Sequence, residues 1–545
     1  MKVSIKVILF FFCLTTIALA DKFYPDDPVW QDPDRITISK PKVVESDETG
    51  EFIKMSFGDP ANTKVQTAQN INTLDEIPDS TWFTNRIGQH SFSNEDLVRG
   101  PNHLEGPDLS MPWKIIKAKS SGVSPGFVIE DGRGDTYFVK FDAADYPQLS
   151  TSAEVVCTKF FYAFGYNVPE NYLVFVPERQ FEIAPDTKIG KDRPFTNEYL
   201  HEILKGVAHR RDGTVQVVAS FKLDGAIGPF QYYGTRSDDA NDIIPHENRR
   251  ELRGLRVFAS WLNHYDIRSV NTLDTFVTTD EKNKTGYVKH YLLDFGSTFG
   301  SAGIQPAKRR TGYEYTLEWT PILKSAATFG LWDRPWWHYQ YPDYAGVGRF
   351  ESEHFEPQNW KPNYPNSAFN RMQIDDALWA TAIVMKFDDD KIRALVKTGH
   401  YEDPRAEDYL VKTLIDRRKK IISYYLSQTN PLYDFRIVNS KVEFTNLGEV
   451  AQISKTNTYQ YQWYRFDNQA GSQEGVGGTG FTKATAIPIP KNSASYLLVK
   501  IHTQSPGEPN WKKEIRVYVR NKEQLSVIGI ERADNIAPQA VAENR

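Results

Sequence analysis

Two short stretches carry residue types suited to phosphoryl transfer. Asp266 is followed five residues later by Asn271, and Asp294 stands directly before Phe295 and Gly296. A carboxylate beside a substrate hydroxyl can accept its proton, while a second carboxylate and an amide oxygen suit Mg²⁺. The sequence therefore predicts a site for Mg–ATP, or Mn–ATP, in which Asp266 is the catalytic acid/base and Asn271 and Asp294 are metal ligands.

Phosphate groups also need a cation, and Lys140 is the candidate. It lies in an apolar strand-like run, residues 137–141, and Glu154 in the first turn of the following helix can hold its ammonium group. The preceding turn contains Gly122 and Gly126, so its backbone N–H groups can cover phosphates. We expect Lys140 and Glu154 to form a phosphate clamp and both glycines to contact the nucleotide.

The elements that must position these side chains follow from the hydrophobic pattern. Strand-like runs at 113–119, 126–130 and 136–141 precede a helix at 152–164 and a strand at 171–176. This order places Lys140 on a strand and Glu154 on the next helix.

A second group of elements leads into the acidic residues. A helix at 245–263 has apolar residues at spacings of three and four, and it ends directly before the 264–271 stretch. A polar turn separates two strand-like runs at 273–278 and 287–293. Such a hairpin would bring Asn271 beside Asp294. Further helices are expected at 375–386, 388–397 and 404–426, and then alternating strand-like runs at 435–444, 459–466, 495–502 and 513–519.

These residues resemble the protein-kinase-like superfamily. His264-Tyr265-Asp266 with Asn271 is similar to the catalytic loop, Asp294-Phe295-Gly296 to the metal-binding triplet, and Val139-Lys140 to the third-strand lysine. The similarity covers roughly residues 110–430. It implies the same roles for Asp266, Asn271, Asp294, Lys140 and Glu154 as the residue chemistry does.

The sequence departs from the usual kinase pattern at several points. Tyr265 replaces the usual Arg, the turn before Gly126 contains Pro125 and lacks a middle glycine, the gap between Asn271 and Asp294 is long, and no Ala-Pro-Glu follows. These differences favour atypical relatives, such as HipA-like, lipid-kinase-like and secretory-pathway kinases.

The predicted fold class is α+β, with a two-lobed kinase-like domain followed by an all-β sandwich domain. The aromatic 332–344 region is either a buried plug or a platform for sugar rings. The expected divisions are a signal peptide at 1–20, an extended N-terminal segment without long helices at 21–110, a small lobe at 111–176, a helical large lobe at 177–430, the β-sandwich at 431–532 and a disordered tail at 533–545.

The first twenty residues have the pattern of a cleavable export signal. Lys2 and Lys6 precede an apolar run at 7–17, and small residues follow at 18–20. The run is too short to span a bilayer, so we expect a secreted or periplasmic protein without an integral membrane span.

The charge and cysteine content limit the partners. The formal net charge of −5 becomes −5 − 2 = −7 without the two signal lysines, and there is no basic stripe, which excludes a nucleic-acid partner. Cys157 is then the single cysteine, so no intrachain disulfide is expected, and it lies in an apolar helical run typical of a core residue. The partner of the β-sandwich is not indicated.

The leading functional hypothesis is an exported atypical kinase-like phosphotransferase that moves the γ-phosphoryl group of ATP to a hydroxyl on a protein or glycan acceptor. A bacterial periplasm contains little ATP, so one alternative is a catalytically inactive, pseudokinase-like binding protein. A second alternative is a carbohydrate-active hydrolase with two carboxylates. The hydrolase predicts acids beside Trp336 and Trp337 in place of a cluster of Lys140 and Asp294.

Overall fold

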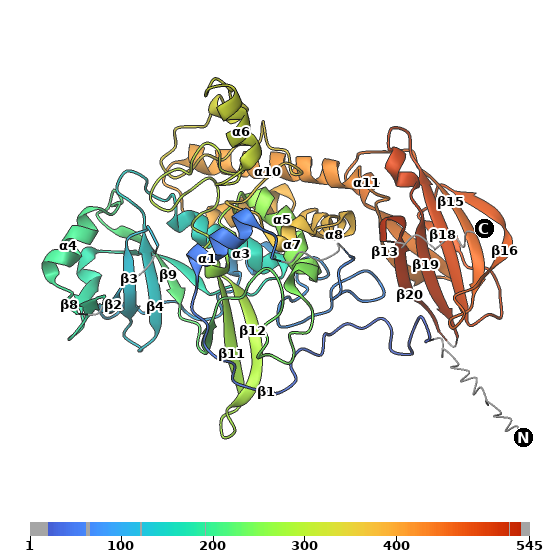
Figure 1. The fold of residues 1–545 in the computed structure, drawn as a ribbon, viewed down its shortest axis with the longest axis horizontal. Coiled ribbons are helices and arrows are strands. Elements are labelled where there is room, and N and C mark those ends of the chain that lie inside the picture. Colours follow the sequence, from blue (N-terminus) through green and yellow to red (C-terminus); the bar gives the residue numbers. More distant parts are fainter. Residues whose placement is uncertain (1–19, 61–65, 120–121, 191, 523, 536–545) are drawn as a thin grey trace, which may run out of the picture.

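The computed structural model describes residues 20–60, 66–119, 122–190, 192–522 and 524–535. Figure 1 shows a mixed sheet at one end and a central group of helices. The C-terminal part, built mainly of strands, lies beyond the end of a long helix. The predicted signal peptide up to residue 19 and the predicted tail from residue 536 lie outside the described residues. Residues 120–121 of the predicted phosphate-covering turn also lie outside them.

The mixed sheet has six strands in the order β5-β9-β4-β3-β2-β6. Strands β2, β3 and β4 form an antiparallel meander, and β9 lies between β4 and β5. The predicted strands and helix are confirmed. Their bounds are β2 Trp113–Ala118, β3 Gly126–Glu130, β4 Thr136–Phe141, α3 Thr151–Phe164, β5 Asn171–Val176, β6 Phe181–Ile183 and β9 Val215–Phe221.

The sheet extends beyond residue 176, where the sequence placed the end of the small lobe. Both β6 and the unpredicted β9 belong to it, and Leu200 and Leu204 of α4 (Asn197–Lys205) pack into its core. Two further short strands, β7 Lys188–Ile189 and β8 Arg193–Pro194, pair with each other. We therefore propose a boundary after β9.

The large lobe is built around α5, Arg250–Leu262, which is buried along almost its whole length. It packs against α8 and α10, and the predicted helices of this part are confirmed. The bounds are α6 Trp319–Ala327, α7 Ser367–Asn370, α8 Ile374–Val384, α9 Asp389–Lys397 and α10 Pro404–Leu426. Cys157 of α3 is buried in the core of this lobe, as expected.

A four-stranded sheet, ordered β1-β12-β11-β10, projects from the large lobe (Figure 1). Its central hairpin consists of β11, Thr272–Asp280, and β12, Thr285–Leu292, as the sequence predicts. The edge strands are β1, Ile38–Ser39, and β10, Ala226–Gly228.

The N-terminal segment contains two helices, α1 Glu48–Phe57 and α2 Asn94–Arg99. The expectation of no long helix is wrong for α1, whose N-terminus is capped by the Asp47 side chain. Trp82 is buried and anchors the segment. The segment passes from the C-terminal all-β part to the large lobe, where it contributes β1 (Figure 1).

Two antiparallel sheets, β13-β14-β17 and β16-β15-β18-β19-β20, form the C-terminal part around one apolar core. This confirms an all-β C-terminal part. The bounds are β13 Leu432–Val438, β14 Lys441–Asn446, α11 Leu447–Val450, β15 Thr458–Phe466, β16 Gln473–Thr482, β17 Ala486–Pro488, β18 Tyr496–Gln504, β19 Ile515–Asn521 and β20 Leu525–Arg532.

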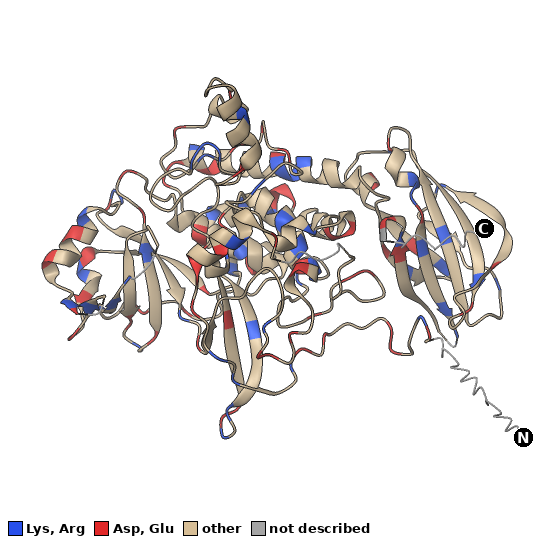
Figure 2. Cartoon of the chain, viewed as in Figure 1, with Lys and Arg blue, Asp and Glu red and all other residues tan. Residues whose placement is uncertain are grey.

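The fold is α+β: a domain of two lobes, one built on the six-stranded sheet and one built mainly of helices, precedes an all-β sandwich. Acidic and basic residues are interspersed along both lobes and the sandwich (Figure 2). In the part of the chain that the structure describes, no helix has the combined length and apolar character needed to cross a membrane.

Candidate active site

Lys140 joins the two lobes through a pair of carboxylates. Its Nζ lies 3.1 Å from Glu154 Oε2 and 2.9 Å from Asp294 Oδ1. The Lys140 side chain is 18% exposed and that of Glu154 is 2% exposed, whereas Asp294 is 47% exposed. The structure thus brings together three predicted residues that are far apart in the sequence, with the Asp294 carboxylate facing solvent.

The charges in this cluster stabilise one another. Burial opposes the charge on Lys140, yet Asp294 and Glu154 outweigh it and raise the pKa of the ammonium group. Burial likewise disfavours the ionised form of Asp294, but Lys140 and Lys119 lower its pKa overall. Burial raises the pKa of Glu154, and Lys140 partly offsets this effect. At neutral pH Asp294 is therefore a carboxylate that is available to a cation.

Glu154 also fixes the segment that follows Asp294. Its Oε1 accepts a 3.0 Å hydrogen bond from the Phe295 backbone N–H. A Cβ atom on Gly296 would lie 2.5 Å from Ser150 Oγ and 3.1 Å from Glu154 Oε2, so a larger residue there would displace the Ser150 hydroxyl. Asp294 itself has a positive φ of 57°, a conformation that Asp adopts more readily than most residues.

Asp266 is held by three neighbouring side chains. Arg268 Nε lies 2.6 Å from Oδ1, and the Asn363 amide donates to the same oxygen at 3.0 Å. Asn271 Nδ2 donates to the Asp266 backbone oxygen at 2.8 Å and to Oδ2 at 3.1 Å. Arg268 and Asn363 are not among the residues that the sequence singled out. In the sequence, the position of Arg268 two residues after Asp266 could have indicated that its side chain contacts Asp266.

The hairpin β11–β12 brings Asn271 back to the residues before Asp294, as expected. The Leu293 N–H donates to the Asn271 carbonyl at 2.9 Å. Because the Asn271 amide nitrogen bonds to Asp266, its side-chain oxygen is left to act as an acceptor or ligand.

This donor set fits Mg²⁺ or Mn²⁺ in a nucleotide complex. Mg²⁺ in such sites takes one or two protein oxygens and completes its shell with phosphates and water. Among the described residues no group of three or more His, Cys, Asp or Glu side chains is placed to hold a metal ion.

The predicted phosphate-covering turn contributes a further cation. Gly126 pairs with Lys140 across β3 and β4, and Gly122 has a positive φ of 80°. Lys119 Nζ donates to the Ser124 carbonyl at 2.6 Å. Burial and the nearby Lys140 ammonium lower the pKa of Lys119 to about 8. Lys119, which the sequence did not single out, is therefore close enough to Lys140, Asp294 and Glu154 to interact with their charges.

His264 is a packing residue in this structure. It is 2% exposed, and its ring lies 5.4 Å from the rings of Phe161 and Phe295. Burial lowers the pKa of His264 to about 4, so the ring is neutral at neutral pH. Tyr265, which replaces the usual Arg, donates its hydroxyl to the Ser301 carbonyl.

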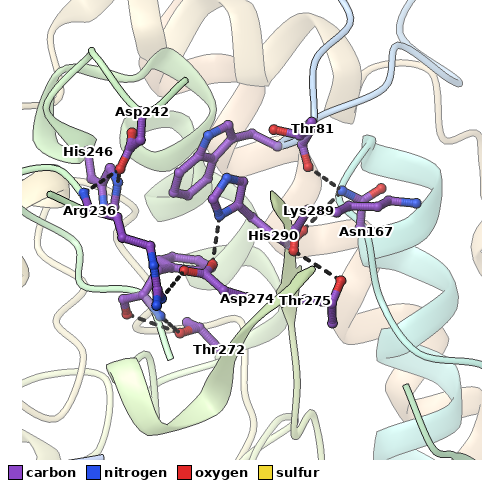
Figure 3. A network of polar contacts seen from close by, with 12 residues as sticks. Thr81, Asn167, Arg236, Asp242, His246, Thr272, Asp274, Thr275, Lys289 and His290 are labelled. Carbon is purple, nitrogen blue, oxygen red and sulfur yellow. Dashed lines mark hydrogen bonds and ion pairs between the residues drawn. The ribbon is translucent and has the colours of Figure 1, made fainter. Parts of the chain in front are cut away.

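A buried polar network includes residues of the β11–β12 hairpin and binds it to neighbouring segments (Figure 3). Asp274 of β11 accepts from Arg236 at 3.1 Å and pairs with His290 of β12 at 2.7 Å. The His290 ring stacks on Trp82, with centroids 3.5 Å apart. Asn167 donates to the backbone oxygens of Thr81 and His290. The N-terminal segment is thereby fixed to the hairpin that connects Asn271 to Asp294.

Helix α1 contacts the catalytic-loop region directly. The buried carboxylate of Glu51 accepts from the Ser269 N–H at 2.8 Å and from the Ser269 hydroxyl. Glu48 pairs with Arg268 at 2.9 Å. Burial raises the pKa of Glu51, while the bonds to Ser269 lower it.

The aromatic 332–344 region is not a buried plug. Trp337 is 45% exposed, and Trp336 donates its Nε1–H to Glu314 at 2.9 Å. Glu314 also pairs with Arg334. One acid, Glu314, thus lies beside Trp336, where the hydrolase alternative predicts two carboxylates. The cluster of Lys140 and Asp294, which that alternative does not predict, is present.

Comparisons with known proteins give little sequence support. No protein-family model matches the chain, and no curated protein matches it. One solved structure that it resembles is the Helicobacter pylori proinflammatory kinase CtkA, at 12% identity and a TM-score of 0.30. That match covers 58% of this chain and 95% of the other. At so low a TM-score the fold assignment stands on the sheet order and contacts described above.

Proposed function

We propose that the chain is an exported, atypical kinase-like phosphotransferase that transfers the γ-phosphoryl group of ATP to a hydroxyl on a protein or glycan. The observation that carries the proposal is Lys140 within 3.1 Å of Glu154 and 2.9 Å of Asp294. A strand lysine, a helix glutamate and an aspartate before Phe-Gly are the parts that hold Mg–ATP in kinases.

The residues divide the chemistry between them. Lys140 binds phosphate oxygens, and Asp294 with Asn271 would hold Mg²⁺ or Mn²⁺, which supplies neutralisation of phosphate charge. The acceptor oxygen forms a bond to the γ-phosphorus as the bond to the bridging oxygen of ADP breaks. The acceptor proton passes to Asp266, which Arg268 and Asn363 hold in place. Gly122 and Gly126 flank the backbone that would cover the phosphates.

Nucleotide binding is the first test. In a thermal-shift titration with ATP and MgCl₂ or MnCl₂, we expect the unfolding midpoint to rise, because a ligand that binds only the folded state stabilises it. Asp294→Ala removes the response, whereas Asp224→Ala, at a side chain 94% exposed, keeps it. An unmutated chain that shows no shift at millimolar nucleotide would overturn the proposal.

Two alternatives are distinguished by experiment. A pseudokinase-like binding protein is expected if the chain is exported to a compartment with little ATP, and absence of nucleotide binding would favour it. A hydrolase fits the carboxylate of Glu314 beside Trp336. Cleavage of a glycosidic substrate that Asp294→Ala leaves unchanged would favour the hydrolase.

A further inference from the structure

A cavity of about 440 Å³ lies in the large lobe, between the aromatic 332–344 region and α10. Its size falls in the range of about 300–1,000 Å³ that is usual for small-molecule sites. The wall residues that matter here are Tyr313, Glu314, Trp336, Tyr339, Glu353 and Glu356. None of the residues discussed above as metal or phosphate contacts lines it.

Neighbouring side chains hold two aromatic rings of the wall in place, one by a hydrogen bond and one by stacking. Trp336 is fixed by its Nε1–H bond to Glu314. Tyr339 stacks on His354, with centroids 3.8 Å apart and planes 8° apart. Rings fixed in this way lose little freedom when a ligand packs against them, so they suit the C–H faces of a flat, rigid molecule.

The charged part of the wall favours hydroxyl groups over anions. Arg417 donates to the Glu351 carbonyl and Lys420 to the Glu353 carbonyl, at 2.7 Å and 2.6 Å, and Arg349 donates to the Ala307 carbonyl. These three cations are therefore engaged with the backbone. The carboxylates of Glu353 and Glu356 are exposed. Glu356 Oε2 accepts from the Asn359 side chain, which leaves its second oxygen and the Glu353 carboxylate as acceptors for a ligand.

The net charge argues against a strongly basic ligand. Four glutamates and three cations line the cavity, which gives −4 + 3 = −1. Glu314 is neutralised by Arg334, and buried Glu351 accepts from the Tyr313 hydroxyl and the His354 N–H. The cavity thus combines fixed aromatic rings, carboxylates that can accept hydrogen bonds from hydroxyl groups, and little net charge. A neutral sugar is recognised by these features.

The cavity is connected to the catalytic loop. Asn263, one residue before His264, lines it and accepts from Trp360 Nε1 at 2.8 Å. Three residues after Trp360, the Asn363 N–H bonds to the Tyr265 carbonyl, and the Asn363 side chain holds Asp266. A ligand that presses on this wall therefore acts on residues that position the proposed base.

We propose that this cavity binds a neutral sugar ring of the glycan acceptor, outside the position where the reacting hydroxyl meets Asp266. The acceptor role rests on the proposed phosphotransferase function, whereas sugar binding itself does not. The ring would pack against Trp336 and Tyr339, with its hydroxyls donating to Glu353 and Glu356.

A glycan array carrying neutral and acidic oligosaccharides, probed with the purified chain, tests the binding. The best neutral glycan is then titrated by calorimetry. We expect Trp336→Ala to weaken its affinity at least tenfold and Glu353→Gln, at an exposed rim residue, to weaken it several-fold. Trp319→Ala, an exposed tryptophan outside the cavity wall, leaves the affinity unchanged.

The outcomes separate the two proposals. Binding of neutral glycans that Asp294→Ala preserves, in a chain that shows no response to ATP, supports the sugar site and overturns the phosphotransferase function. A response to ATP without any neutral glycan bound overturns the sugar site. Binding that Trp336→Ala leaves unchanged, or a Lys- and Arg-rich peptide that binds in place of glycans, also overturns it.

Discussion

At the scale of single residues, the site depends on charges that require one another. Lys140 neutralises Glu154, which is 2% exposed and would otherwise be an unpaired buried carboxylate. Glu154 in turn accepts from the Phe295 N–H and so fixes the backbone next to Asp294. The same lysine therefore serves stability and the arrangement of Asp294, the proposed metal ligand.

These two contributions can be separated by substitution. Lys140→Met leaves Glu154 without its cation, and we expect a loss of about 3 kcal/mol in the free energy of unfolding. The double variant Lys140→Met with Glu154→Gln recovers most of this loss, since no buried charge remains. Neither variant responds to Mg–ATP in a thermal-shift assay. Urea denaturation measures the stabilities, and an undiminished ATP response in Lys140→Met would contradict the proposed clamp.

His264 predicts a pH dependence of stability. Its folded pKa of about 4 lies below the ordinary value of 6.5, so between these values the unfolded chain binds a proton that the folded chain does not. Stability is thus full above pH 6.5 and falls as the pH decreases towards 4. From pH 7 to pH 5 the loss is about 2 kcal/mol.

The variant His264→Phe keeps an aromatic ring against Phe161 and Phe295 but removes the titrating group. Urea denaturation at pH 7 and pH 5 should show a smaller loss for the variant than for the unmutated chain. Equal losses in the two proteins would show that His264 does not carry this pH dependence.

At the scale of elements, the β11–β12 hairpin links Asn271 to Asp294, the two proposed metal ligands, and its position depends on contacts with residues that are distant in the sequence. Asp274 is 1% exposed and accepts from both Arg236 and His290 (Figure 3). The network reaches the N-terminal segment through the stack of His290 on Trp82. The hairpin is therefore positioned by buried charge as well as by strand pairing.

Removing the shared carboxylate tests this dependence. Asp274→Ala leaves His290 without its acceptor and Arg236 with the partly exposed Asp238, so we expect a loss of about 3 kcal/mol in unfolding free energy. Affinity for Mg–ATP also falls, because Asn271 and Asp294 are less well fixed. Thr278→Ala, at an exposed position of the same strand, is the control. A stable Asp274→Ala with normal ATP affinity would show that strand pairing alone sets the hairpin.

Elements with a clear period could be predicted, and those defined by distant contacts could not. The helix 404–426 was predicted to the residue, and the hairpin follows from two apolar runs around a polar turn. β9 was missed because the apolar run Val215–Phe221 lies in a stretch with mixed signals and becomes a central strand only by pairing with β4 and β5. Helix α1 was missed because its sequence includes Gly50 and β-branched residues. Its contact with Ser269 supplies the stabilisation.

The candidate site follows the same division. Residue type and spacing were enough to select Lys140, Glu154 and Asp294, which lie in contact, and Asp266 and Asn271, which are joined by a hydrogen bond. The catalytic and metal-binding roles of these residues stay predictions. Asn363 and Glu51 reach the catalytic loop from segments that lie about 100 and 200 residues away in the chain. No local pattern marks such residues.

At the scale of the whole molecule, the sandwich is joined to the large lobe by buried polar contacts. Trp511 donates its Nε1–H to the Leu426 carbonyl at the end of α10. Arg532 of β20 is 4% exposed and lies 3.2 Å from Asp75 of the N-terminal segment. Asp75 also pairs with Arg250 of α5, which pairs with Asp375 and Asp376 of α8. This series of ion pairs therefore extends from the sandwich into the core of the large lobe.

Such a connection predicts that the sandwich and the large lobe unfold together. Arg532→Ala breaks the link at Asp75 and also removes donors to the Asn430 and Leu432 carbonyls at the start of the sandwich. Because removal of one partner from a buried ion pair costs about 3–5 kcal/mol, we expect the sandwich to unfold first in the variant. Differential scanning calorimetry should then resolve two transitions in place of one. Arg465→Ala, at an exposed ion pair within the sandwich, should leave the single transition intact. If Arg532→Ala keeps one transition at an unchanged midpoint, this series of ion pairs does not couple the two parts, and other contacts, such as the bond from Trp511 to Leu426, must do so.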